Sequence, residues 1–392
     1  MLPFEEAIDL IMGTVRYLGD EDVPLGEADG RVLAADIRSD IDMPPFDKSA
    51  MDGFACRRAD LDGPLTVVET IPAGSLPGRP IEKGECARIM TGAAVPEGAD
   101  VVVRIEDTEE SGGVVRVTGE AGKSNICLLG EDIRKGDRVL ERGASIDPAR
   151  IAVLASVGAD PVRVARRPVV GISVTGDELV EPDQRPSPGR IRNSNGRQLA
   201  AQASRAGLEP VYLGIAEDTP ESIARVLDRE RGIIDVWIFS GGVSMGDYDY
   251  VPGVLREAGF TLLVEKVAMK PGKPLVFGTS GGSWVFGLPG NPVSTYVIFE
   301  MIVRPFCRAL MGGGPGHRTF RGIMERGAGS RVSNRLSHLP VIVHPDGKIS
   351  PVEYHGSAHI HAYCAADGII RVPPGSPPPE GGEEVLVYLT PA

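Results

Sequence analysis

Between residues 168 and 312, short apolar runs alternate with stretches of helical periodicity. Apolar runs at 168–174, 211–215 and 234–240 precede helical patterns at 195–206, 220–231 and 251–258, and shorter runs follow at 262–267, 275–278 and 284–287. A long apolar helix is expected over 291–310. This alternation is typical of a parallel sheet flanked by helices. We therefore predict a central α/β domain over 168–312, with Trp237 and Trp284 in its core.

The segments on either side have a different pattern. An amphipathic helix of about four turns is expected from residue 3 to residue 18, and a second helix over 146–158. Short β-rich runs between Gly, Pro and Asp turns indicate a small β-domain over about 54–140. After the glycine-rich segment 312–316, a hairpin centred on 344–347 and strands at 369–372 and 384–389 predict a second small β-domain.

Charge and composition exclude several classes of function. The formal net charge of −13 argues against bulk nucleic-acid binding, which requires a basic face. No apolar run approaches the roughly 18 residues of a membrane span, and the N-terminus has no signal-peptide pattern, so we expect a cytoplasmic protein without a membrane anchor. The five scattered cysteines predict neither disulfides nor a zinc site. All six histidines follow residue 316, which disfavours histidine-dependent nucleophiles in the rest of the chain.

Small and polar residues cluster where the predicted strands end, and ligands of open α/β sheets bind beyond the carboxyl ends of the strands. Glycines let backbone N–H groups approach an anion closely, and a helix N-terminus adds positive potential. These loops are therefore candidate phosphate cradles, although each motif alone is also common in turns. The candidate binding residues are Thr175, Gly176, Ser240, Gly241, Gly242, Ser244, Pro289, Gly290, Asn291 and Pro292.

Charged residues accompany these loops. Lys270 and Lys273, in the string Lys-Pro-Gly-Lys-Pro, can neutralise a phosphate or another oxyanion. Glu178, Asp218 and Asp249 supply hard oxygen ligands of the kind that Mg²⁺ prefers. For Asp218 the alternative is a helix cap, because a helical pattern begins near residue 220. The set suits metal-assisted chemistry on a nucleotide or pyrophosphate.

Seven strings occur in order along the chain: Ser-Ala-Met-Asp-Gly at 49–53, Thr-Gly at 91–92, Gly-Glu-Asp at 130–132, Thr-Gly-Asp-Glu-Leu at 175–179, Ser-Gly-Gly-Val-Ser at 240–244, Lys-Pro-Gly-Lys-Pro at 270–274 and Leu-Pro-Gly-Asn-Pro at 288–292. Together they resemble the molybdopterin molybdenumtransferases, the MoeA family that includes the C-terminal domain of gephyrin. The resemblance spans essentially the whole chain.

The resemblance implies a multidomain α/β plus β fold with four domains. Residues 1–44 with 140–167 would form an N-terminal helical and β domain for dimerisation, and 45–139 an inserted β-domain. Residues 168–312 would be the molybdopterin-binding, MogA-like α/β domain, and 317–392 a barrel-like C-terminal β-domain. An elongated homodimer is implied, with each active cleft shared between the α/β domain of one subunit and the inserted domain of the other.

The implied reaction is the Mg²⁺-dependent insertion of molybdate into adenylated molybdopterin with release of AMP, downstream of a molybdopterin adenylyltransferase. By resemblance, the glycine loops would hold the nucleotide and pterin phosphates, and Glu178, Asp218 and Asp249 would serve Mg²⁺ or the ribose. Lys270 and Lys273 would hold molybdate or phosphate. The catalytic set across the dimer interface would be Asp52, Thr91 and Asp132, with Asp52 the expected catalytic carboxylate.

Three alternatives stay open on the sequence. A tungstate-inserting relative would use a near-isosteric oxyanion. A nucleotide hydrolase or deamidase of the competence-damage type carries a similar α/β domain, but should lack the strings at 49–53 and 288–292. A non-catalytic scaffold of the gephyrin kind is the third.

Overall fold

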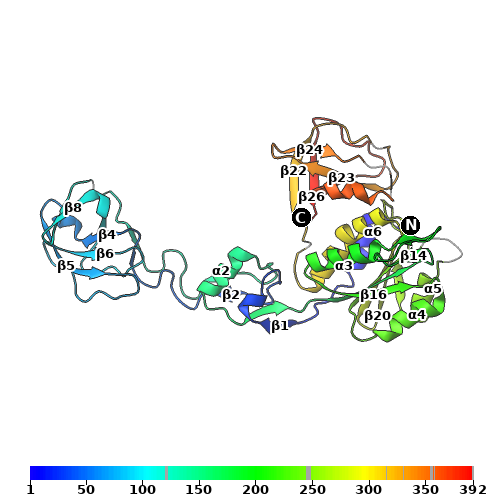
Figure 1. The fold of residues 1–392 in the computed structure, drawn as a ribbon, viewed down its shortest axis with the longest axis horizontal. Coiled ribbons are helices and arrows are strands. Elements are labelled where there is room, and N and C mark those ends of the chain that lie inside the picture. The colour runs from blue at the N-terminus through cyan, green and yellow to red at the C-terminus, as the bar shows by residue number, and fades with distance from the viewer. Residues whose placement is uncertain are drawn as a thin grey trace.

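The computed structural model describes residues 1–119, 122–243, 249–314, 316–329, 331–353, 356 and 358–390. The molecule is elongated, with an α/β unit and a C-terminal barrel side by side at one end (Figure 1). A small unit follows, and a β-domain lies at the other end of an extended arm. Within the described residues, no helix has the length and apolar character needed to cross a membrane.

The sheet of the α/β unit has the strand order β16-β13-β17-β21-β20-β18. Its first four strands are parallel, as predicted: β16 (Glu209–Ala216), β13 (Val169–Thr175), β17 (Val236–Ser240) and β21 (Ser283–Leu288). The expectation of a parallel sheet is wrong for β20 (Val276–Ser280), which pairs antiparallel with β21 and with β18 (Thr261–Val264). Only Gly281 and Gly282 separate β20 from β21, and a parallel crossover needs a dozen or more residues.

Helices cover both faces of this sheet. On one face lie α3 (Asn195–Arg205), α6 (Pro292–Ile298) and α7 (Arg304–Leu310), which share one apolar core, and on the other lie α4 (Pro220–Arg229) and α5 (Val251–Glu257). Along β17, Val236 and Ile238 face the first core, whereas Trp237 and Phe239 face the second. Burial on both faces explains the continuous apolar character of the strand. The predicted long helix is continuous through a π-helical turn, η4 (Phe299–Val303), between α6 and α7.

The first helix, α1 (Phe4–Met12), is shorter than the four turns expected. It ends at the C-cap Gly13, and the backbone carbonyl and hydroxyl of the next residue, Thr14, both accept from the Trp284 indole, at 3.3 and 3.1 Å. Phe4 and Ile11 are buried in the first core of the α/β unit. Residues 1–18 therefore pack on the α/β unit, while the chain from residue 20 onward enters the small unit.

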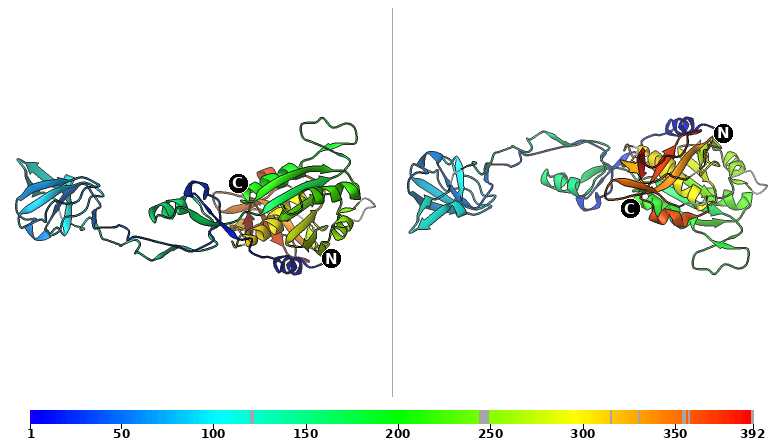
Figure 2. Two further views of the ribbon diagram at one scale, coloured as in Figure 1. Left: turned by 90° about the horizontal axis from the view of Figure 1, so that it is seen from below. Right: turned by 90° about the horizontal axis from the view of Figure 1, so that it is seen from above.

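The small unit forms where the chain leaves the α/β unit and returns to it. Strand β1 (Asp20–Val23) pairs antiparallel with β12 (Val162–Ala165), and α2 (Pro148–Ser156) is capped by Asp147, which accepts from the Arg150 N–H at 2.9 Å. Beyond it, two chain segments run side by side as the arm (Figure 2). Their pairings are β2 (Ile37–Arg38) with β11 (Arg138–Leu140) and β3 (Lys48–Ser49) with β10 (Ile126–Cys127).

The β-domain at the end of the arm is a six-stranded sheet, β7-β4-β6-β5-β9-β8. Both faces carry buried residues, and burial raises the pKa of the Cys56 and Cys86 thiols to about 12. These two cysteines are therefore protonated packing residues. The strands are β4 (Gly53–Cys56), β5 (Leu65–Ile71), β6 (Glu85–Ile89), β7 (Val101–Arg104), β8 (Thr108–Ser111) and β9 (Val114–Val117).

The C-terminal segment closes into a five-stranded barrel, because β25 pairs with both β26 and β23. The predicted hairpin around 344–347 joins β23 to β24. A short strand of the α/β unit, β19 (Met269–Lys270), pairs with the start of β23 and connects the two units. The barrel strands are β22 (Thr319–Met324), β23 (Leu336–Val343), β24 (Lys348–Pro351), β25 (Gly368–Val372) and β26 (Glu384–Leu389).

The aromatic cluster under the sheet gives a test of the α/β core. Phe306 is fully buried, with its ring centroid 5.6 Å from those of Trp284 and Phe277 and 5.4 Å from that of Phe286. We expect Phe306→Ala to lower the free energy of unfolding of this unit by about 3–5 kcal/mol. Urea unfolding followed by tryptophan fluorescence measures this, since both tryptophans lie in the unit. Leu76→Ala, at a side chain that is 82% exposed, is the control, and equal midpoints for both variants would contradict the packing argument.

Candidate functional site

A cavity of about 620 Å³ lies at the carboxyl edge of the parallel strands, and we call it the edge cavity. Its walls are the loops that follow β13, β17 and β21. The structure thereby brings together nearly all the predicted binding residues: Thr175, Gly176, Ser240, Gly241, Gly242, Pro289, Gly290, Asn291 and Pro292. Ser244 lies outside the described residues.

Close packing of two loops explains the glycine pair. A Cβ on Gly241 would lie 2.4 Å from the carbonyl oxygen of Thr175, and φ at Gly241 is +104°, so only glycine fits there. The Thr175 hydroxyl is buried and has no hydrogen-bond partner within the described residues. A buried polar atom without a partner is rare in native proteins. Its position in the cavity wall is suited to a polar ligand group.

Asn195 ties the loops of the edge cavity together, and the sequence reasoning had placed it only as the start of a helix. Its side-chain amide donates to the Ser240 hydroxyl at 2.9 Å and to the Gly290 carbonyl at 2.8 Å. The capping role in this segment belongs instead to Asn193, which accepts from the Gly196 N–H at 2.9 Å. The sequence signal for this role was the run Asn-Ser-Asn at the start of the helix. One asparagine is enough to cap a helix, which leaves the other for a different role.

All three predicted metal-binding acids, Glu178, Asp218 and Asp249, line the edge cavity. Asp218 is not a helix cap, because the Thr219 hydroxyl accepts from the Ser222 N–H at the start of α4. Instead, Asp218 and Asp177 each accept from the other's backbone N–H at 3.2 Å. Across the described parts of the chain, no group of three or more His, Cys, Asp or Glu side chains is close enough to hold a metal ion alone.

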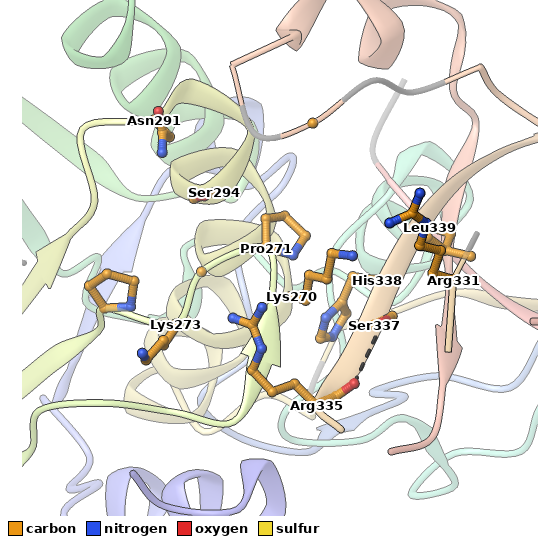
Figure 3. A pocket seen from close by; sticks show the side chains of 13 residues that line it. Lys270, Pro271, Lys273, Asn291, Ser294, Arg331, Arg335, Ser337, His338 and Leu339 are labelled. Atoms are coloured by element: carbon orange, nitrogen blue, oxygen red, sulfur yellow. Dashed lines mark hydrogen bonds between the residues drawn. The ribbon is translucent and has the colours of Figure 1, made fainter. Parts of the chain in front are cut away.

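A second cavity of about 800 Å³ lies between the α/β unit and the barrel, and we call it the basic pocket (Figure 3). Lys270 and Lys273 line it from the α/β unit, whereas Arg331 and Arg335 line it from the barrel. Its described lining contains no acidic residue. The two cavities adjoin, because Pro274, Asn291 and Ser294 belong to both walls.

His338 also lines the basic pocket, and sequence reasoning assigned it no role. Its side chain is fully buried, and a hydrogen bond with the backbone of Lys270 opposes the effect of burial on its pKa. Burial, with a smaller contribution from Arg371, lowers the pKa of His338 to about 3, so the ring is uncharged at neutral pH. Neither Arg331, Arg335 nor His338 belongs to a motif, and only the closed barrel brings them to this pocket.

The structure brings Asp52 and Thr91 together from distant parts of the sequence. One Asp52 carboxylate oxygen accepts from the Thr91 backbone N–H at 2.6 Å and from its hydroxyl at 2.8 Å. These two hydrogen bonds hold the pKa of the Asp52 carboxyl below its usual value. The pair lies on the solvent-exposed edge of the β-domain next to β4.

Asp132 is not part of this pair. It lies on the arm, where its backbone N–H donates to the Met43 carbonyl at 3.1 Å, and it lines a separate hollow with Lys48 and Glu131. The arm holds the β-domain far from the α/β unit of the same chain (Figure 1). Within one chain, therefore, neither Asp52 nor Thr91 lines the edge cavity or the basic pocket.

Comparison with known proteins gives consistent matches along the chain. Residues 2–158 match the model of the MoeA N-terminal region (domain I and II), residues 171–309 that of a probable molybdopterin binding domain, and residues 330–390 that of the MoeA C-terminal region (domain IV). The molybdopterin molybdenumtransferase of Staphylococcus epidermidis is 36% identical, over 98% of this chain and 95% of its own. That of Bacillus subtilis is 35% identical, over 99% and 94%. The structure of the molybdopterin biosynthesis MoeA protein from Pyrococcus horikoshii OT3 superposes with a TM-score of 0.85 at 28% identity, covering 100% of both chains.

The Asp52–Thr91 pair generates a prediction on pKa. In Thr91→Val the hydroxyl donor is lost but the backbone N–H remains, so the pKa of Asp52 should rise part of the way to its usual value. Carbon-detected NMR titration of the Asp52 carboxyl measures this shift. Thr66→Val, at an exposed strand position of the same domain, is the matched control. An unchanged Asp52 pKa in Thr91→Val would show that the hydroxyl does not stabilise the carboxylate.

Proposed function

The chain belongs to the MoeA family of molybdopterin molybdenumtransferases, enzymes of molybdenum cofactor biosynthesis, and from that premise we propose its reaction in detail. We propose that it inserts molybdate into adenylated molybdopterin, with cleavage of the phosphoanhydride and release of AMP. The observation that carries this proposal is the junction of the two cavities. A polar cavity built from glycine loops shares part of its wall with a basic pocket, so a substrate bound in the first would lie next to an oxyanion bound in the second.

The edge cavity suits the phosphates of the adenylated substrate. The loops after β13, β17 and β21 line it, and Asn195 fixes the loops after β17 and β21 relative to each other. Asn291 precedes α6, so the positive end of that helix faces the same region. Backbone donors held in this way can bind phosphate oxygens without the cost of reorganising the loops.

The basic pocket suits molybdate. Lys270 and Lys273 supply positive charge in a lining whose described residues include no acid, which favours a compact dianion over a neutral ligand. The pocket borders the edge cavity at Asn291 and Ser294, where the reacting ends of the two substrates would meet. In this proposal the lysines bind and orient the oxyanion, and neutralise charge that develops at the oxyanion and phosphate.

Mg²⁺ fits the chemistry of the acids in the edge cavity. Glu178, Asp218 and Asp249 are hard oxygen donors, and together with substrate phosphate oxygens and water they would hold the ion. Bound there, Mg²⁺ would neutralise phosphate charge. The protein alone offers no three-residue cluster in its described part, which accords with an ion that binds together with the nucleotide.

A homodimer with shared clefts accounts for the remote position of Asp52. A second copy of the chain could bring its β-domain to the cleft of the first, placing an ionised Asp52 beside the reacting groups. Large exposed apolar side chains along the arm support association with another copy, since such groups seldom stay in water when several occur together. These side chains are Ile41, Phe46, Met51, Leu128 and Leu129.

The proposal includes a cytoplasmic location and an adenylyltransferase that supplies the adenylated substrate. It favours the transferase over a nucleotide hydrolase or deamidase, because both ends of the chain match regions of the MoeA family and not the α/β domain alone. Molybdate and tungstate are both tetrahedral dianions, and the choice between them is left to the assay below.

The first test is release of AMP by the full-length protein with adenylated molybdopterin, Mg²⁺ and either molybdate or tungstate. We expect AMP release that depends on molybdate and on Mg²⁺, and that falls by about a hundredfold or more in Asp52→Asn, as expected when a reacting carboxylate is lost. Asp62→Asn, at an exposed acid of the same domain, controls for the loss of one charge. AMP release with tungstate alone would show that the protein inserts tungsten instead of molybdenum. No AMP release with either oxyanion would contradict the proposed reaction.

The second test addresses the shared cleft. Asp52→Asn and Lys273→Ala subunits should each be inactive as homodimers, because each variant removes one side of every cleft. Mixed dimers should regain up to about half the wild-type activity per dimer, since one of their two clefts takes Asp52 and Lys273 from the unaltered sides. Mixed dimers isolated with two affinity tags allow this measurement. If they stay as inactive as the parents, Asp52 and Lys273 act within one chain.

A further inference from the structure

Another cavity lies at the opposite edge of the same sheet, and we call it the amino-edge pocket. It has a volume of about 510 Å³, and its lining includes Thr14, Arg16, Thr261, Thr279 and the turn 280–283 between β20 and β21. Strand β21 begins at this pocket and ends at the edge cavity, and its six residues separate the two by roughly 15–20 Å. The proposed reaction therefore leaves the amino-edge pocket without a role.

One wall of the pocket is a row of side chains across three strands. Thr261 on β18 lies opposite Thr279 on β20, and Thr279 lies opposite Trp284 on β21. Side chains that lie opposite each other share one face of a sheet. Trp284 belongs to the apolar core beneath α1, and its indole donates to Thr14 directly after that helix. Where the cover of α1 ends, the sheet face thus carries threonine hydroxyls instead of apolar groups.

Arg16 is held beside this row by packing rather than by an acid. Its guanidinium carbon lies 5.1 Å from the centre of the Trp284 ring. Gly282, with φ at +110°, lets the guanidinium lie on the turn, because a Cβ there would overlap it. No ion pair in the described part of the chain includes Arg16. Its charge therefore stays available at the pocket.

Hydroxyl groups complete the polar lining of the pocket. The Ser283 hydroxyl is used within the fold, since it donates to the Ile234 carbonyl at 3.2 Å. The hydroxyls of Thr261, Thr279 and Ser280 have no hydrogen bond within the described residues. The described lining contains no acid. One guanidinium with free hydroxyl donors and no competing carboxylate is the chemistry that binds a compact oxyanion.

We infer that the amino-edge pocket binds a phosphate group, either of the free ion or of a small phosphate ester, with Arg16 as its main ligand. The planar guanidinium would donate two parallel hydrogen bonds to two phosphate oxygens, and the threonine hydroxyls would donate to the others. This site is separate from the proposed reaction, because none of its lining residues lines the edge cavity or the basic pocket.

The test is fluorine NMR of the full-length protein labelled with fluorotryptophan and titrated with sodium phosphate at constant ionic strength. The chain has two tryptophans, so two signals are expected, and W237F assigns them. We expect the Trp284 signal to shift and to saturate, because a bound anion changes the position of the guanidinium stacked on its ring. A shift that does not saturate, or that sodium chloride reproduces at equal ionic strength, would overturn the inference.

Variants of the pocket test which groups bind the phosphate. R16Q should weaken phosphate binding about tenfold or more, as for the loss of hydrogen bonds to a charged group, and R16K should be intermediate. The double variant T261V/T279V should weaken it about fivefold or more without a change of charge. R142Q is the matched control, since Arg142 is also exposed and stacks on the Tyr17 ring at 4.9 Å but does not line the pocket. Wild-type affinity in R16Q would overturn the inference, as would equal affinities in R16Q and R142Q.

A further variant separates this site from the proposed oxyanion site. K273A should leave the phosphate-dependent shift of Trp284 unchanged, because Lys273 lines the basic pocket. Loss of that shift in K273A would overturn the inference, since the signal would then report binding in the basic pocket. Titration with glycerol phosphate distinguishes the two sources of the phosphate group. Tighter binding than that of inorganic phosphate would assign the site to an ester, and weaker binding would assign it to the free ion.

Discussion

The antiparallel pairing of β1 with β12 fixes where the chain leaves the α/β unit and where it returns, and the rest of the architecture depends on it. We call this pair of strands the root of the arm, and arginines stabilise it on both sides. Arg31 is buried and donates to Glu21 on β1 and to the Ala165 carbonyl of β12, and Arg166 holds Asp235 through two hydrogen bonds of 2.9 and 2.8 Å. Asp235 also accepts from the Val169 N–H at the start of β13. The root is thus tied directly to the central strands, and the arm that extends from it holds the β-domain away from the cavities of its own chain.

Two kinds of wall divide the chemistry at the carboxyl edge of the sheet. The edge cavity is lined by acids, hydroxyls and glycine backbone, which suits phosphate groups that bring their own cation. The basic pocket is lined by lysines and arginines, which suits a free oxyanion. Asn291 and Ser294 belong to both walls, so the two cavities share a boundary. The acidic side chains of one cavity and the basic side chains of the other therefore lie next to each other but in separate cavities.

The sequence allowed the edge cavity to be predicted because parallel strands place their following loops at one edge, whatever the tertiary details. It did not allow the pair of Asp52 and Thr91 to be predicted from physical reasoning alone, since the register of β4 on β6, with Gly53 opposite Ile89, brings them together. The apolar pattern also overestimated the length of α1, which ends at Gly13 before Thr14 binds the Trp284 indole. Arg335 carries no sequence signal, because its position depends on the pairing of β19 with β23, in which Met269 lies opposite Leu336, more than 60 residues further along the chain.

The distribution of histidine bears on how such a site handles protons. Of the described histidines, His338 alone lines the basic pocket, and burial keeps it uncharged far below neutral pH. His317 is likewise held neutral, with its pKa lowered to about 4 by burial, and its ring bonds the Glu300 carbonyl away from either cavity. Asp52, in contrast, is held ionised by Thr91. Near neutral pH none of these three groups changes its charge, so none of the three makes the charge of the protein depend on pH in that range.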